Sequence, residues 1–259
     1  MSDLIIGVGE IGGGLRDLFT ERGRDVCGFD LNPDRCFGRP EHIQLIHICI
    51  PYTSTFVDEV QRYVQKWRPQ GVVLHSTVQP GTTKLLHEDR RISPLVYSPI
   101  RGVHARMAFD LKRYVKFYSS YPPTDDSLFC ECFQEDCGLT IDRFSTPFAL
   151  ETAKILIDSS YYGWIIAYGQ LVDKLCVGQG LAYDELWKFA DQIHEFLGNR
   201  PKTYVDPQGI GGHCVLQNLD LIEDMLPEVK AIITNINEET KKRHRPHGRG
   251  SLLRGHFSR

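Results

Sequence analysis

The stretch LIIGVGEIGGGL, residues 4–15, joins an apolar run to an amphipathic segment through closely spaced glycines. Gly7, Gly9 and Gly12 have the spacing GxGxxG, which is typical of the strand–turn–helix that binds a dinucleotide. Gly7 permits the tight turn, Gly9 lets a pyrophosphate approach the backbone, and Gly12 lets helix and strand pack closely. The free N–H groups at the start of the helix favour an anion. The predicted cofactor contacts in this loop are Gly7, Gly9, Glu10, Ile11 and Gly12.

A second apolar run, DVCGFD at 25–30, ends in an acid, Asp30. A carboxylate at this place can accept hydrogen bonds from the adenosine ribose hydroxyls and would repel a 2′-phosphate, so the sequence favours NAD. Arg35 nearby leaves NADP as an alternative, and a domain of this type that binds no dinucleotide is a further one. Pro51 and Thr77, which follow the third and fourth apolar runs, complete the predicted cofactor contacts.

Short apolar runs alternate with amphipathic segments through residues 1–146. The predicted strands are 4–9, 25–30, 45–50, 71–76, 94–98 and 115–119, with a helix at 55–67 among the segments between them. Continuously apolar strands that alternate with helices indicate a parallel sheet covered on both faces. We therefore predict an α/β fold whose first domain, residues 1–146, is of the Rossmann type and binds NAD.

From Pro147 onward the pattern becomes helical. Residues 148–176 form one long pattern that is apolar nearly all round, which predicts a buried helix. Further helical patterns follow, the last at 219–226, so residues 147–240 are predicted to form a smaller all-helical domain. The basic segment 241–259 can contact a polyanion such as nucleic acid, but it has few residues to bury and is expected to be a disordered tail.

Composition sets limits on location and on metal binding. No apolar run reaches the ~18–20 residues of a membrane helix, and no basic region precedes the first apolar run as in a signal peptide. A cytoplasmic protein with reduced thiols is therefore expected. Cys130, Cys132 and Cys137 are close in sequence, but no second ligand pair or histidine cluster accompanies them, so no metal is expected.

Three further motifs follow the glycine loop in a fixed order: STVQPGTT at 76–83, Lys154 in the long helical pattern, and GIGGHC at 209–214. In this order they resemble the UDP-glucose/GDP-mannose dehydrogenase family, especially its N-acetylmannosaminuronate-type branch, over roughly residues 1–225. The resemblance implies NAD-dependent oxidation of a primary alcohol of a nucleotide sugar to a carboxylate. In that family a cysteine attacks the intermediate aldehyde, the thiohemiacetal passes a hydride to a second NAD, and water hydrolyses the thioester.

The resemblance assigns roles to individual residues. Cys214 would be the nucleophile, Lys154 would stabilise charge at the reacting oxygen, and Thr77 would lie near the nicotinamide or the catalytic water. Arg200 would bind substrate, and the helix at 148–176 would pair with its copy in a homodimer. The residues alone allow His213 to lower the pKa of Cys214, but they equally allow Cys214 to be an inert thiol in a glycine turn. Lys154 can instead belong to a structural ion-pair cluster.

The sequence also departs from the family pattern. Ile100 stands where the family has a glutamate after Ser98-Pro99. A basic cluster follows, formed by Arg101, His104 and Arg106, which can bind an anionic substrate group or form a solvated loop. The family asparagine and aspartate are exchanged, as Asp158 and Asn218, which predicts a swapped amide and carboxylate around Lys154. The family's C-terminal nucleotide-binding domain has no counterpart in this sequence, so a smaller substrate, a second chain that completes the site, or a lost reaction are all open.

These patterns leave three functions. The first is an NAD-dependent oxidoreductase that acts on an alcohol or aldehyde carbon of a small polar or anionic substrate through Cys214, Lys154 and Asp158. The second is a hydroxy-acid or imine dehydrogenase without covalent catalysis, in which Lys154 is the proton donor. The third is a non-catalytic NAD-binding protein.

Overall fold

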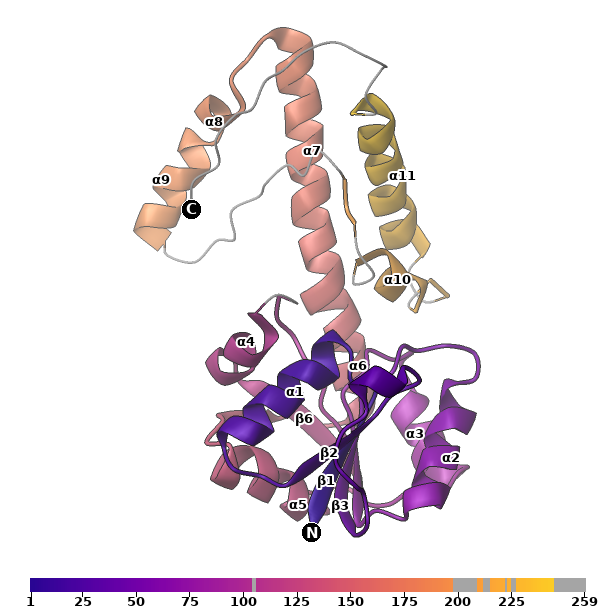
Figure 1. Ribbon diagram of the computed structural model, residues 1–259. Coiled ribbons are helices and arrows are strands. Elements are labelled where there is room, and N and C mark those ends of the chain that lie inside the picture. The colour runs from indigo at the N-terminus through magenta and orange to yellow at the C-terminus, as the bar shows by residue number, and fades with distance from the viewer. Residues whose placement is uncertain (104–105, 198–208, 212–214, 222, 225–226, 245–259) are drawn as a thin grey trace. The chain divides into compact units, whose positions relative to one another are not determined.

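The computed structural model describes residues 1–103, 106–197, 209–211, 215–221, 223–224 and 227–244 (Figure 1). The chain divides into two compact units, Met1–Ser159 and Ser160–Arg259. The division falls after Ser159, inside a helical segment, whereas the sequence analysis placed a domain boundary at 146/147. The cause is that the start of this helical segment packs on the sheet of the first unit, where Leu150 belongs to a core cluster.

A seven-stranded sheet in the order β2-β1-β3-β4-β5-β6-β7 forms the first unit. Its strands are β1 (Ser2–Ile6), β2 (Val26–Phe29), β3 (Ile43–Ile48), β4 (Gly71–Leu74), β5 (Leu95–Tyr97), β6 (Lys116–Tyr121) and β7 (Ile141–Arg143). All pairs are parallel except β5 with β6. The predicted Rossmann-type α/β fold is confirmed. The strand predicted at 115–119 corresponds to β6, but its antiparallel pairing with β5 and the short, largely exposed β7 were not predicted.

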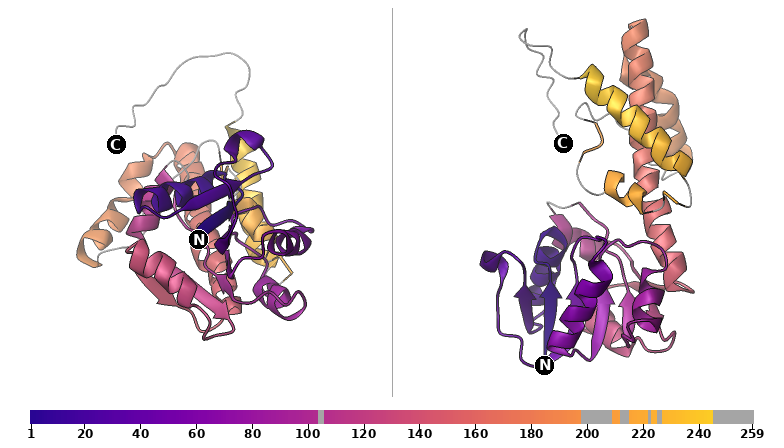
Figure 2. Two further views of the ribbon diagram at one scale, coloured as in Figure 1. Left: turned by 60° about the horizontal axis from the view of Figure 1, so that its bottom comes forward. Right: turned by 90° about the vertical axis from the view of Figure 1, so that its right-hand side faces the viewer.

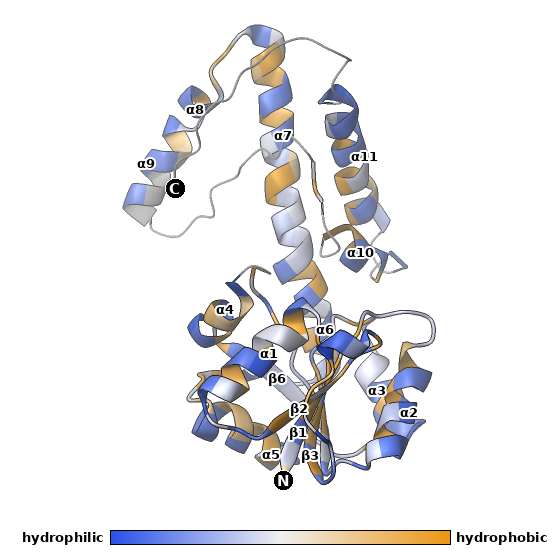
Figure 3. Cartoon of the chain, in the orientation of Figure 1, coloured by the Kyte–Doolittle hydropathy of each residue, from blue (hydrophilic) through white to orange (hydrophobic). Residues whose placement is uncertain are grey.

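Helices cover both faces of this sheet (Figure 1). One face carries α1 (Glu10–Glu21), α4 (Met107–Arg113), α5 (Ser127–Cys130) and the π-helical η3 (Glu131–Asp136), and the other carries α2 (Phe56–Trp67), α3 (Thr82–Glu88) and α6 (Pro147–Ala153). The 3-10 turn η1 (Pro33–Arg35) follows β2. Figure 3 shows apolar residues along the strands and polar residues on the outer sides of α1 and α2. The continuous apolar runs are thus explained by burial on both faces.

The long helical pattern predicted at 148–176 consists of three consecutive elements. These are α6 (Pro147–Ala153), the π-helical η4 (Lys154–Ser160) and α7 (Tyr161–Gln179). Thr146 is the N-cap of α6, and its hydroxyl accepts a hydrogen bond from Ala149 N. Gly180, in the left-handed conformation, is the C-cap of α7. The π segment was not predicted, because hydrophobic periodicity cannot separate an i→i+5 turn from an α-turn within a uniformly apolar run.

The second unit contains α7, α8 (Tyr183–Leu186), α9 (Lys188–Leu197), α10 (Val215–Asp220) and α11 (Pro227–Arg243). Helix α11 lies beside α7 (Figure 2), and α10 and α11 pack closely against Gly163 of α7. The core of this unit includes Ile166, Ile210, Leu219 and Ile233. None of the described helices is long and apolar enough to span a membrane.

Two predictions for this part of the chain were wrong in detail. The helix predicted at 219–226 is the end of α10, and the next helix begins only at Pro227. The segment predicted as a disordered tail from 241 begins inside α11, whose last residue Arg243 forms an ion pair with Asp173 of α7. This half-buried ion pair holds the end of α11 against α7, beyond the point where the apolar pattern ends. Residues 245–259 lie outside the described residues.

Candidate active site

The glycine loop runs from the end of β1 into α1. Gly7 has a φ of +86°, and a Cβ on Gly12 would lie 2.1 Å from the Gly7 carbonyl oxygen, so neither position accepts a side chain. Gly9, the residue before α1, is different, because the nearest atom to a Cβ there is Arg35 Nη1 at 4.0 Å. The loop therefore leaves open space above Gly9, where α1 presents backbone N–H groups. Glu10 and Ile11 form the first turn of α1.

Asp30 is fixed against this loop at the end of β2. Its Oδ2 accepts a hydrogen bond of 2.7 Å from Val8 N, and its Oδ1 accepts one of 2.9 Å from Asn32 N. An ionised carboxylate has about four acceptor positions, so both oxygens keep capacity for a further donor such as a ribose hydroxyl. The side chain is half-buried. Asp30 is thus pre-oriented at the place where the sequence analysis expected it.

The other predicted cofactor contacts occur after neighbouring strands of the same sheet. Pro51 follows β3 and is exposed, and Thr77 follows β4 and is half-buried. Because β1 to β4 are parallel, the residues that follow them lie at one edge of the sheet. In sheets of this kind ligands bind at that edge, where the strand order reverses, here between β1 and β3.

The STVQPGTT segment is held to α6 by a buried carboxylate, Glu151. Gly81 N and Thr83 N donate to its oxygens at 2.6 and 2.8 Å, and Thr83 Oγ1 donates at 2.5 Å. Burial raises the pKa of the Glu151 carboxyl, while these three donors act in the opposite direction. The partners of Glu151 are backbone and hydroxyl groups at the start of α3, which link the segment after β4 to the helix that precedes Lys154.

Lys154 and Asp158 form an ion pair in the π-helical segment η4. Their side chains are 11% and 29% exposed, so the pair is reached from one side. They line a pocket of about 170 Å³ that lies wholly within the first unit. The remaining lining residues are Pro99, Arg101, Val115, Phe117, Phe144, Leu150, Ala153 and Ile157. The structure therefore brings three predicted site residues, Arg101, Lys154 and Asp158, to one largely apolar pocket.

Arg101 is held in this pocket by aromatic rings. Its guanidinium carbon lies 4.9 Å from the ring centre of Tyr114 and 5.0 Å from that of Phe117, and Nη2 donates to Val115 O at 3.3 Å. Arg101 Nε has no hydrogen-bond partner among the described residues. A guanidinium fixed in this way keeps donors available for a carboxylate or phosphate. The signal in the sequence was the basic cluster after Ser98-Pro99, and nothing in it pointed to the aromatic residues.

Arg106 does not share this pocket. It lines a separate depression of about 260 Å³, together with Gly9, Glu10 and Gly13 of the glycine loop and α1. Its Nε donates to the buried Asp110 at 3.1 Å. The sequence predicted one cluster of Arg101, His104 and Arg106, but the two arginines line separate pockets. Arg106 directly precedes α4, which packs on α1 through Met107 against Gly14.

The remaining predicted site residues belong to the second unit or lie outside the described residues. The start of the GIGGHC motif is held to α11, since Asn237 Oδ1 accepts from Ile210 N at 2.5 Å and Asn237 Nδ2 donates to Ile210 O at 3.2 Å. Asn218 is half-buried in α10. Outside the described residues lie His104, Arg200, His213 and Cys214. The proposed swap between Asp158 and Asn218 stays a prediction.

No protein-family model matches the sequence, and no curated protein matches it. Solved structures do match. The UDP-D-ManNAc dehydrogenase of Pyrococcus horikoshii has a TM-score of 0.77 at 17% identity, covering 93% of this chain and 69% of that one. The UDP-N-acetyl-mannosamine dehydrogenase of Staphylococcus aureus has a TM-score of 0.74 at 15% identity, covering 93% and 68%. The 3-hydroxyisobutyrate dehydrogenase of Mycobacterium tuberculosis has a TM-score of 0.64 at 16% identity, covering 93% and 94%.

The similar structures are thus dehydrogenases, and at these identities the likeness concerns the fold. The chain has the fold of the nucleotide-sugar dehydrogenases across most of its length, while its match spans about two thirds of the first two of those chains. The resemblance inferred from the sequence motifs is confirmed at the level of the fold.

Proposed function

We propose that this protein is an NAD-dependent oxidoreductase that oxidises the alcohol carbon of a small polar or anionic substrate in the pocket of Arg101, Lys154 and Asp158. The observation that carries the proposal is this pocket, in which two cations and one carboxylate lie in an otherwise apolar wall. The same unit contains a glycine loop that is open above Gly9. Charged groups that converge in a largely apolar pocket are typical of an active site.

The residues at the edge of the sheet fit NAD. Gly9 leaves room for a pyrophosphate beside the N-terminus of α1, and Asp30 presents a fixed carboxylate to a ribose. Pro51 and Thr77 would contact the cofactor from the ends of the neighbouring strands. NAD bound there would supply the hydride acceptor for the oxidation. The position of Arg35 Nη1 near Gly9 supports a further contact to a phosphate.

The chain's own groups would bind and polarise the substrate. Arg101 would hold an anionic group of the substrate with its free donors. The Lys154 ammonium would lie near the reacting oxygen and stabilise its negative charge, or receive the proton that the hydroxyl loses if the amine is neutral. Asp158, which pairs with Lys154, would fix the orientation of the ammonium. Loss of one such electrostatic group costs about 10²- to 10³-fold in kcat in enzymes where it has been removed.

The covalent step remains a finer proposal. The Cys214 sulfur would add to an aldehyde carbon while the C=O π bond breaks and the oxygen takes up the thiol proton, giving a thiohemiacetal. The support is the GIGGHC motif, whose Ile210 is held by two hydrogen bonds to Asn237. The second candidate is a hydroxy-acid dehydrogenase that uses Lys154 as the proton donor without a cysteine. It is favoured by the match to 3-hydroxyisobutyrate dehydrogenase, which covers 94% of that chain, and by Ile100 in place of the family glutamate.

A homodimer through the helix that contains residues 148–176 belongs to the same proposal. Apolar and aromatic side chains are exposed along the second unit's part of this helix, among them Tyr161, Tyr162, Tyr168, Leu171 and Leu175. A row of exposed apolar residues on one helix is typical of an interface between protein chains. The homodimer predicts that the protein elutes from a calibrated gel-filtration column at twice the mass of one chain.

The test measures NADH formation over a panel of nucleotide sugars and small hydroxy acids, with NAD binding measured by calorimetry. Arg101→Ala and Lys154→Ala are expected to lower kcat/KM by at least about 10²-fold with unchanged NAD affinity. Lys174→Ala, which removes an exposed lysine that is ion-paired in the second unit, is the matched control and should leave the rate unchanged. Cys214→Ala separates the mechanisms, because it abolishes turnover only if the cysteine is the nucleophile. NAD binding without turnover of any substrate would refute the proposal and indicate a non-catalytic protein.

A further inference from the structure

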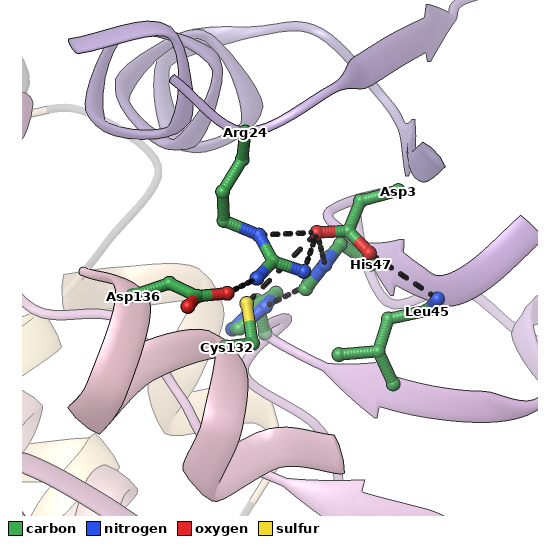
Figure 4. Close-up of polar contacts among 7 residues, drawn as sticks. Asp3, Arg24, Leu45, His47, Cys132 and Asp136 are labelled. Carbon is green, nitrogen blue, oxygen red and sulfur yellow. Dashed lines mark hydrogen bonds and ion pairs between the residues drawn. The ribbon is translucent and has the colours of Figure 1, made fainter. Parts of the chain in front are cut away.

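Three potential metal ligands from distant parts of the sequence meet in the interior of the first unit (Figure 4). Asp3 comes from β1, His47 from β3 and Cys132 from η3, and all three side chains are fully or almost fully buried. Asp3 Oδ2 lies 3.8 Å from His47 Nε2 and 3.9 Å from Cys132 Sγ, and the three ligand atoms all lie within 4.8 Å of one another. We infer that this cluster is a structural zinc site.

The spacing suits a tetrahedral metal. Zinc lies about 2.0–2.3 Å from oxygen, nitrogen and sulfur ligands, so the ligand atoms of a tetrahedral site are about 3.3–3.8 Å apart. The distances from Asp3 Oδ2 to the other two ligand atoms are at or just beyond this range. Small side-chain shifts would bring the three atoms to bonding distance. Carboxylate, imidazole and thiolate together suit Zn²⁺ better than Mg²⁺ or Ca²⁺, which prefer oxygen alone.

The hydrogen bonds behind His47 direct a lone pair into the cluster. His75 Nδ1 lies 2.8 Å from Ser98 O, which can only accept, so this nitrogen carries the proton and His75 Nε2 is an acceptor. His47 Nδ1, 3.1 Å away, must then donate to it. In a neutral imidazole the other nitrogen, His47 Nε2, has a lone pair. His47 Nε2 has no hydrogen-bond partner in the described structure and faces the carboxylate of Asp3. A nitrogen lone pair and a carboxylate oxygen that face each other are both acceptors, and a cation between them would stabilise this arrangement.

Cys137, which directly follows η3, is the candidate for a fourth ligand. Its N donates to Cys132 O at 3.1 Å, which places the two cysteines one π-turn apart, and its side chain is fully buried. Its sulfur is not among the ligand atoms that lie within 4.8 Å of one another, so the Cys137 side chain would have to shift to complete a tetrahedral set. The sequence predicted no metal, because no histidine accompanies these cysteines along the chain. The fold supplies His47 and Asp3 from the sheet.

Arg24 compensates the charge of this site and orients its carboxylate. Its Nε and Nη2 donate to Asp3 Oδ2 at 2.9 and 2.7 Å, so zinc at this oxygen would replace one of the two bonds. Leu45 N donates to the other oxygen of Asp3, and Asp136 pairs with Arg24 on its outer side. With Cys132 and Cys137 both as thiolates, these two sulfurs, the Asp3 carboxylate, Zn²⁺ and the guanidinium sum to zero charge, and Asp136 adds one negative charge on the outer side. Ligating carboxylates in proteins are usually hydrogen-bonded in this manner.

Such a site would fasten η3 to β1 and β3. Because all its ligands are buried, it offers no position for a substrate and is independent of the proposed oxidoreductase activity. Zinc would stabilise the first unit, because a metal that binds only the folded state stabilises it by mass action.

The experiment is Co²⁺ titration of the reduced, chelator-treated full chain, followed by absorption spectroscopy and thermal unfolding. We expect one Co²⁺ per chain with tetrahedral d–d bands and sulfur-to-cobalt charge transfer, and a higher Tm with Zn²⁺ than with chelator. Cys132→Ser should lose the charge-transfer band. Cys130→Ser, at a half-buried neighbouring cysteine that contacts Tyr118, is the matched control and should keep it.

Two results would overturn the inference. The first is a folded wild-type chain that takes up no stoichiometric cobalt with thiolate bands, which would make Arg24 the only cation of the cluster. The second is a Cys132→Ser variant that keeps the wild-type bands, which would place the metal at other cysteines. Circular dichroism of each variant checks that it is folded. If Cys132→Ser does not fold, the wild-type chain alone tests the inference. Thiolate-to-cobalt bands together with a higher Tm in Zn²⁺ than in chelator support the site, and the absence of both overturns it.

Discussion

Lys116 in β6 provides the sharpest test of the interior of the first unit. The side chain is 5% exposed, its Nζ donates to Ser98 O at 3.3 Å, and it lies 4.7 Å above the ring of Phe133. Burial lowers the pKa of the lysine from 10.5 to about 7. The groups that also act on its charge are the thiols of Cys49, Cys132 and Cys137 and the ammonium of Lys154. His75 Nδ1, 3.4 Å away, faces it from the end of β4.

The magnitude follows from the change in pKa. Between pH 7 and 10.5 the unfolded chain binds a proton that the folded chain has released, so the free energy of unfolding rises with pH in this window. At 1.36 kcal/mol for each pKa unit, the ammonium destabilises the fold by about 5 kcal/mol below pH 7. Roughly 1–2 kcal/mol of this cost disappears between pH 7 and 8.5. Lys116→Met removes the charge and keeps an unbranched side chain, at a cost of about 1 kcal/mol for the lost hydrogen bond.

The assay is urea unfolding of wild type and Lys116→Met from pH 7 to 8.5, with chelator present so that metal binding does not contribute. We expect the variant to be more stable than wild type by a few kcal/mol at pH 7. This difference in the free energy of unfolding should be roughly 1–2 kcal/mol smaller at pH 8.5. Lys84→Met, at a lysine that is 60% exposed, is the control and should show no narrowing. A pH-independent difference between wild type and Lys116→Met would refute the reasoning, because the buried amine would then not titrate in this range.

Three further predictions concern the candidate active site. Gly12→Ala should prevent NAD binding or folding, because its Cβ would lie 2.1 Å from a backbone carbonyl oxygen, whereas Gly9→Ala has open space around it and should fold normally. Calorimetry measures NAD binding and circular dichroism measures folding of the two variants. Equal behaviour of the two variants would contradict the geometry of the loop. Glu151→Ala should lower the free energy of unfolding in urea by about 3–5 kcal/mol, because it leaves buried N–H donors unpaired. Glu151→Gln should lower it by less. A decrease below about 1 kcal/mol for Glu151→Ala would show that the fold does not need the carboxylate. Asp158→Asn should lower kcat far more than Asn218→Ala does. The double variant Asp158→Asn/Asn218→Asp should recover activity. If its kcat is no higher than that of Asp158→Asn alone, the swapped pair is excluded.

The sequence predicted the fold wherever one local pattern sets one local structure. The six predicted strands and the helix at 55–67 correspond to β1 to β6 and α2, because apolar runs of this length with turn residues between them have few alternatives. The glycine loop was equally accessible, since Gly7 and Gly12 occupy positions that exclude any side chain. The exposed edge strand β7 was missed, because a three-residue strand on the border of a sheet buries too little to leave an apolar pattern.

The candidate site was predicted only in part. Arg101 and Lys154 were named from their sequence context, but their common pocket depends on Phe117 and Phe144, which carry no motif. Arg106, five positions after Arg101, was predicted to share its cluster but lines a different pocket, beside the glycine loop. Closeness along the chain does not decide which pocket a long side chain enters.

The sequence by itself determined that this protein has a Rossmann-type domain with a glycine loop and an acid at the end of the second strand, because these features depend on contacts between residues close in the chain. Tertiary structure alone decided which charged groups meet. Lys154 and Asp158 of η4 share a pocket with Arg101 from the loop after β5. Asp3 of β1, His47 of β3 and Cys132 of η3 meet in the interior of the first unit. Such groups are far apart in the chain, and only the burial of the apolar faces around them, which no local pattern specifies, fixes their distances.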